Sequence, residues 1–199
     1  MLFLDIKKCF KYESRAGFTV IELLVVIAII TVLPAIVISN FPQIQKQFAI
    51  SRAVYKFSQD IRSVQDMALS SLPYKDQFGE SKEVSGYGIY VDINVLGNKK
   101  YILYADNNDN QASNKEYDEL DYIVSEIDFS LTESEILMKE INNVYNNSVS
   151  INFNPPNPDT TITELNQGAN KVDIVFAVGS DLTRTRTVSI NTAGLIEVK

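Results

Sequence analysis

One long apolar stretch dominates the pattern of the chain. From residue 18 to residue 38 it runs 21 residues with Glu22 as the only charged side chain. At about 1.5 Å per residue, such a helix is roughly 30 Å long, enough to cross the apolar core of a bilayer. The pattern therefore predicts a membrane-spanning helix. Glu22 is its anomaly, because a lone carboxylate in a lipid-exposed helix costs about 2.5–3.5 kcal/mol.

The pattern becomes amphipathic after Pro42. Apolar residues now recur at intervals of three and four, the spacing of one helix face. They are Ile50, Val54, Phe57, Ile61, Val64 and Ala68, and Ile44 and Phe48 start the same stripe. Pro73 predicts that this helix, continuous from Phe18, ends near Ser71. Its apolar face needs a cover, and a β-sheet from the rest of the chain is favoured over a self-associating coiled coil.

The chain beyond Pro73 is rich in β-branched and aromatic residues, which predicts strands. We expect a hairpin with its turn at 94–98, two single strands and a closing three-stranded meander. The expected strands are 85–93, 99–106, 121–126, 148–153, 171–179, 184–191 and 194–199. The stretch 132–141 is expected to be a short helix or irregular. The predicted fold class is α+β, with the long N-terminal helix packed against a twisted antiparallel β-sheet head.

Composition argues against several classes of enzyme. The chain has no histidine, which removes the commonest general base and metal ligand. Its one cysteine, Cys9, has no partner for an intrachain disulfide and cannot form a cysteine zinc site. No nucleophile or phosphate-loop motif is present, so a membrane-anchored enzyme is disfavoured. The net charge of −7 also opposes non-specific binding of nucleic acid by the whole chain.

Basic residues precede the apolar stretch and predict its orientation. They are Lys7, Lys8, Lys11 and Arg15, against Asp5 and Glu13. This excess predicts that the first residues stay in the cytoplasm and that the remainder is translocated. An ordinary signal peptide fits poorly, because the stretch is too long, carries a carboxylate and lacks a small-x-small cleavage site. A plain single-span anchor explains the length and the lysines but not Glu22.

The sequence RAGFTVIELLVVIAII, residues 15–30, resembles the signal of type IV prepilins and type II secretion pseudopilins. The resemblance implies that Gly17 is the last residue of a leader removed by a prepilin peptidase on the cytoplasmic side. It implies that Phe18 becomes the N-terminus and is N-methylated, and that Glu22 is the signature glutamate. A charge that is paired in an apolar setting costs far less than an unpaired one. Glu22 is therefore expected to meet the Phe18 ammonium of another subunit during assembly.

The resemblance implies a pilin-like organisation in four parts. These are a cleaved leader (1–17), a transmembrane and filament-packing half-helix (18–42), an amphipathic half-helix (43–71) and a β-rich head (72–199). A looser similarity of the stalk and the last strands to minor pseudopilins favours a minor subunit over a major one. The implied partners are other pilin or pseudopilin subunits, the prepilin peptidase, the inner-membrane assembly platform and, before assembly, membrane lipid. The head is expected outside the cytoplasm, first on the inner membrane and then in a cell-surface or periplasmic filament.

A polar run in the head is a candidate calcium loop. Asp106, Asn108 and Asn110 alternate as do the first three ligands of an EF-hand-like loop, and Asp118 or Glu119 can close the cage. The glycine and the final glutamate of a true EF-hand are missing. A solvated acidic turn is the alternative, because Asp and Asn favour turns for conformational reasons alone.

Four basic residues near the C-terminus are a candidate DNA site, because related minor pilins bind DNA for uptake. They are Lys171, Arg184, Arg186 and Lys199. Two of them, Arg184 and Arg186, stand two apart and share one face of a strand. A solvated strand that discourages aggregation is favoured over a DNA site. Removing residues 1–17 takes away four basic and two acidic residues, so the net charge falls from −7 to −9 and opposes DNA binding further.

Overall fold

The computed structural model describes residues 17–76, 78–107, 115–155 and 159–199. The chain divides into two compact units, Met1–Pro42 and Gln43–Lys199. One helix, α1 (Val20–Leu69), contributes its first part to the first unit and the remainder to the second. The predicted helix, 18–71, is confirmed, although it begins two residues later and ends two residues earlier than predicted.

In the first unit, the helix has the length and composition that the apolar pattern predicts. Val20–Ile38 is long and apolar enough to cross a membrane, and its large apolar side chains are exposed. The helix continues through Pro34. Thr31 turns its hydroxyl inward, where it donates to the carbonyl oxygens of Ile27 (3.0 Å) and Ala28 (2.9 Å). The one hydroxyl of this segment is thus satisfied by the helix itself, as an apolar surrounding requires.

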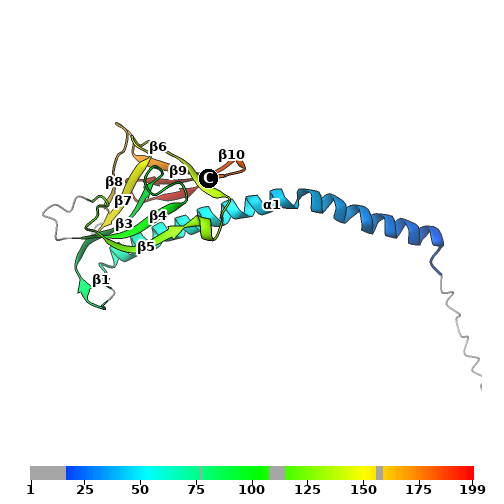
Figure 1. Ribbon diagram of the computed structural model, residues 1–199, viewed down its shortest axis with the longest axis horizontal. Coiled ribbons are helices and arrows are strands. Elements are labelled where there is room, and N and C mark those ends of the chain that lie inside the picture. Colours follow the sequence, from blue (N-terminus) through cyan, green and yellow to red (C-terminus); the bar gives the residue numbers. More distant parts are fainter. Residues whose placement is uncertain (1–16, 77, 108–114, 156–158) are drawn as a thin grey trace, which may run out of the picture. The chain divides into compact units, whose positions relative to one another are not determined.

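The second unit consists of the rest of α1 and an antiparallel β head, whose strands gather along the helix after Gln43 (Figure 1). Its strands are β1 (Tyr74–Lys75), β2 (Ser81–Lys82), β3 (Val84–Asp92), β4 (Lys100–Asn107), β5 (Tyr122–Asp128), β6 (Ile136–Asn142), β7 (Ser148–Asn154), β8 (Asp159–Ile162), β9 (Lys171–Val178), β10 (Asp181–Asn191) and β11 (Ile196–Val198). A short 3-10 helix, η1 (Phe129–Leu131), follows β5.

The strands form two main sheets, where the sequence predicted one. The five-stranded sheet has the order β5-β4-β3-β7-β8 and the four-stranded sheet has the order β11-β10-β9-β6. The predicted hairpin of β3 and β4 and the closing meander of β9, β10 and β11 are confirmed. The short strands β1, β2 and β8 were not predicted.

Strand β6 corrects the expectation of a short helix or irregular segment. It pairs with β9, but the register shifts between Met138 and Glu140. The bulge puts the buried residues Ile136, Met138 and Ile141 at spacings of two and then three. A spacing of three is typical of a helix face. Because the bulge breaks the alternation of a strand, the pattern of buried residues does not predict one here.

The core of the second unit joins the helix to both sheets. Phe57 of α1 is fully buried, and its ring lies 4.9 Å from that of Tyr101 in β4 and 5.2 Å from that of Phe176 in β9. The predicted face from Ile50 to Ala68 is buried against them. The two residues predicted to start this face are an exception, because the Ile44 side chain is 43% exposed and the Phe48 side chain is 61% exposed. The sheets therefore bury this apolar face fully only from Ile50 onward.

Candidate functional site

The predicted cleavage position lies just before the helix. Gly17 and Phe18 precede α1, and the Phe18 side chain is 85% exposed. A Cβ atom added to Gly17 would meet no described atom within 4 Å. The packing of the described chain therefore requires neither the glycine nor the phenylalanine. Arg15 and the rest of the predicted leader before Gly17 lie outside the described residues.

Thr19 and Glu22 form a capping box at the start of α1. The Glu22 Oε2 atom accepts hydrogen bonds from the backbone N–H and from the hydroxyl of Thr19, each at 2.9 Å. The Glu22 N–H donates to the Thr19 hydroxyl oxygen at 3.2 Å. These bonds satisfy donors that the first turn of a helix otherwise leaves unpaired. The carboxylate that was an anomaly in the sequence has partners within its own chain.

Thr19 is a residue that the sequence analysis missed. The signal was present, because a threonine followed three residues later by a glutamate, ahead of an apolar run, is the pattern of a capping box. Glu22 was assigned from the family resemblance alone. The structure adds that only one of its two carboxylate oxygens is used, since the described residues give Oε1 no partner.

The candidate calcium loop is described only at its ends, because Asn108 and Asn110 lie outside the described residues. Asp106 at the end of β4 is 1% exposed, and its Oδ2 accepts from Asn152 Nδ2 at 3.3 Å. Asp118 Oδ1 accepts from the Leu120 N–H at 2.7 Å, and Glu119 is exposed. Across the described part of the chain, no three acidic, histidine or cysteine side chains are grouped to hold a metal ion. The calcium site stays a prediction.

Asp106 lies beside a second carboxylate. The Asp121 carboxylate accepts hydrogen bonds from the backbone N–H groups of Asn107 and Asp118, each at 2.9 Å. One side chain therefore binds both described ends of the loop. Burial, followed by the negative charge of Asp121, raises the pKa of Asp106 to about 6. Burial also raises the pKa of Asp121, while its two backbone hydrogen bonds oppose the change. A proton or a cation is therefore favoured here.

The candidate DNA residues do not form one patch of free cations. Lys171 pairs with Asp173 at 3.3 Å and Lys199 with Glu197 at 3.3 Å. Arg184 donates from Nε to Asp181 Oδ2 at 3.1 Å. Of the four, only Arg186 has no hydrogen bond or ion pair among the described residues.

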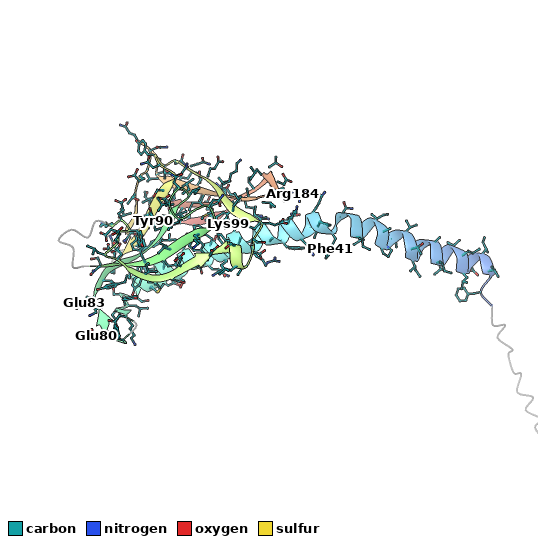
Figure 2. All side chains as sticks on the ribbon, viewed as in Figure 1. Phe41, Glu80, Glu83, Tyr90, Lys99 and Arg184 are labelled. Atoms are coloured by element: carbon teal, nitrogen blue, oxygen red, sulfur yellow. The ribbon has the colours of Figure 1, made fainter. Side chains whose placement is uncertain are left out.

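Arg184 connects β10 to the helix. Its two terminal nitrogens donate to the carbonyl oxygen of Gln43 at 3.2 Å and to the Gln43 side-chain oxygen at 3.0 Å. Figure 2 shows Arg184 where β10 approaches α1. Lys46 adds a second connection from the helix to the β9–β10 turn, donating to the Ser180 hydroxyl at 2.8 Å. Arg184 thus has a structural role that the sequence did not predict.

Comparison with known proteins gives one match. Residues 14–38 match the family model of the prokaryotic N-terminal methylation motif. No curated protein and no solved structure matches the chain. The matched segment contains Gly17, Phe18, the capping box and the apolar part of α1.

Proposed function

Because residues 14–38 carry the signature of type IV prepilins and pseudopilins, we propose that the chain is a structural minor subunit of a type IV pilus or a type II secretion pseudopilus. A prepilin peptidase cleaves it after Gly17, and Phe18 is then N-methylated. It enters the filament through α1. The head is displayed outside the cytoplasm, and the chain rests in the inner membrane before assembly.

The observation that carries this proposal is the arrangement around Phe18. Gly17 and Phe18 lie outside the helix and make no packing contact that would require either residue. Directly after them, the apolar helix begins at Val20, and the carboxylate of Glu22 in its first turn is already held by Thr19. The fold does not need Gly17 or Phe18, and both lie at a fixed distance from Glu22, a charged group that lipid disfavours. This arrangement is the one expected if other proteins recognise these residues.

Mass spectrometry of the N-terminus in membrane and filament fractions tests the processing step. We expect a chain that begins at N-methylated Phe18. A chain that retains Met1 in both fractions would overturn the proposal. The leader contains Cys9, so loss of the only thiol of the chain gives an independent measure of cleavage.

Substitution of Glu22 tests the assembly step. We expect Glu22→Ala to be inserted and cleaved but to enter the filament poorly, because the Phe18 ammonium of a neighbouring subunit loses its carboxylate. The matched control is Glu83→Ala, which removes an exposed carboxylate of the head with no partner among the described residues. Equal incorporation of both variants would contradict the role of Glu22.

A DNA-binding minor pilin is the alternative function. The contacts of the described residues give it little support, because three of the four candidate cations are already paired with carboxylates. A gel-shift assay with the cleaved chain tests it. Salt-dependent binding of duplex DNA that is lost in Arg186→Ala would favour this alternative.

A further inference from the structure

An open groove lies between α1 and the first part of β10 in the second unit. Its volume is about 570 Å³. The helix contributes Gln47 and Ile50, and β10 contributes Arg184 and Arg186. No carboxylate side chain is among the described residues that line it. The groove is therefore a basic feature on a chain whose net charge is −7.

The two arginines of the groove differ in how their donors are used. Arg184 donates to Asp181 and twice to Gln43, so its planar guanidinium is fixed in one orientation. Arg186 is half-buried and makes no hydrogen bond or ion pair with the described residues. A guanidinium has five N–H donors and is always charged, so the donors of Arg186 remain available to a partner outside the chain.

The strand directs Arg186 toward the helix side of the sheet. Arg186 is two residues from Val188 and four from Ile190, which are both fully buried in the core. Side chains two apart on a strand share a face, so Arg186 lies on the face that covers α1 and not on the opposite one. There it extends the core face into the groove, next to the buried Ile50 and the exposed Gln47.

We propose that this groove is a docking site for a neighbouring filament subunit, and that Arg186 binds an aspartate or glutamate of that subunit. The proposal rests on the proposed function, because it requires a filament. An arginine and a carboxylate form two parallel hydrogen bonds, and Arg186 has its whole fork available. The exposed amide of Gln47 offers a further hydrogen bond to the same segment, whereas Arg184 beside it is already paired with Asp181.

Charge distribution favours an acidic protein segment over a nucleic acid. Asp181 lies 3.1 Å from Arg184, and Glu197 lies 3.3 Å from Lys199, so carboxylates accompany the other cations on both sides of Arg186. A run of phosphates would meet these carboxylates at successive positions, whereas a single carboxylate can reach Arg186 alone. The groove therefore suits one acidic side chain and its neighbours.

A zero-length cross-link in intact filaments tests this pairing. Arg186→Lys keeps the positive charge and supplies an amine, which a carbodiimide joins to a carboxylate that is in direct contact. We expect a cross-linked pair of subunits that the wild-type chain does not give, with residue 186 joined to an aspartate or glutamate of the partner. The matched control is Arg62→Lys, since Arg62 is exposed on α1 and has no partner among the described residues.

Incorporation gives the second measurement. We expect Arg186→Gln to reduce the amount of subunit in the filament at least fivefold, and Arg62→Gln to leave it unchanged. A subunit present in filaments with a mature Phe18 terminus, but giving no cross-link at residue 186, would overturn the docking site and leave the proposed function intact. Binding of a 20-base-pair DNA duplex that depends on Arg186 would overturn it in favour of a nucleic acid. Absence of the wild-type chain from every filament would instead refute the proposed function.

Discussion

The hydroxyl of Tyr101 donates a hydrogen bond of 2.5 Å to the carboxylate of Asp60, across the boundary between the sheet and the helix. Lys56, one helical turn before Asp60, donates to the same Oδ2 atom at 3.1 Å. The Tyr101 ring is fully buried and lies edge-on to Phe57 of the same helix. One tyrosine therefore makes both an apolar and a charge-assisted contact with α1, and fixes the rotation of the helix under the head.

Tyr101→Phe is expected to lower the free energy of unfolding by about 1.5–3 kcal/mol, the range for a hydrogen bond to a charged group. The ring contacts remain, so the loss reports the hydroxyl alone. Urea denaturation of the full chain in detergent micelles measures it. Tyr55→Phe is the matched control, because Tyr55 is 55% exposed on the same helix. Identical midpoints for the two variants would show that the Tyr101–Asp60 bond contributes nothing.

Gly88→Ala is expected to destabilise the head by about 1–3 kcal/mol, because it would insert a methyl group into a filled space. A Cβ at Gly88 would lie 2.5 Å from the Tyr104 hydroxyl oxygen. The Tyr104 ring is fully buried and lies against Tyr117, so it has little room to move away. Thermal unfolding of the full chain in detergent provides the measurement.

A double-mutant cycle identifies the cause of this effect. In a Tyr104→Ala background the ring is gone, and Gly88→Ala should then cost much less than it does alone. If the cost of Gly88→Ala were the same in both backgrounds, the backbone of β3 and not the tyrosine would be the reason for the glycine.

The helix and its buried face could be predicted because local patterns determine them. The spacing of Ile50, Val54 and Phe57 specifies one face whatever covers it, and all three are buried. The spacing could not indicate where the cover begins. Ile44 and Phe48 continue the same stripe but remain exposed, because the position at which the sheets start depends on contacts far along the chain.

The contacts of the candidate sites were less predictable for the same physical reason. Arg184 and Gln43 are 141 residues apart, and no local rule pairs them. The Asp106–Asn152 bond likewise joins two strands that only the sheet order brings together. The contact of Thr19 differs from these, because its partner Glu22 is only three residues away. The sequence alone therefore contains the pattern of a capping box.

Stability should fall as the pH rises from about 4 to 7, because of Asp106. Its pKa is about 6 in the folded chain, against an ordinary value of 3.8. Between these pH values the folded chain binds more protons than the unfolded chain. The contribution of Asp106 to the free energy of unfolding is therefore fully present below about pH 4 and is lost as the pH rises through about 6. The full effect is about 3 kcal/mol, from the difference of the two pKa values.

Asp106→Asn should remove this dependence and make the chain more stable at pH 7.5, because the amide has no charge to desolvate and can still accept from Asn152. Unfolding midpoints at pH 5 and pH 7.5 give the measurement. Asp66→Asn removes an exposed carboxylate from α1 and is the matched control. A variant Asp106→Asn that retained the wild-type difference between the two pH values would exclude Asp106 as its cause.

Thr19→Val should loosen the start of α1 while leaving the apolar helix able to enter a membrane. The substitution keeps the shape of the side chain but removes the hydroxyl that donates to Glu22 and accepts from its backbone N–H. Losing such a cap costs about 1 kcal/mol. Glu22 would then keep only the backbone N–H of residue 19 as a partner, and its carboxylate would no longer be held in one orientation for a neighbouring ammonium.

Two measurements on Thr19→Val separate these consequences. Amide hydrogen exchange in the first turn of α1, measured in detergent micelles, should be faster than in wild type. Incorporation into filaments should fall several-fold. Thr19→Ser restores the hydroxyl, so it should return both values to those of wild type, and mass spectrometry should find the Phe18 terminus in all three chains. Normal incorporation of Thr19→Val with faster exchange would mean that the capping box serves the helix alone and does not position Glu22 for assembly.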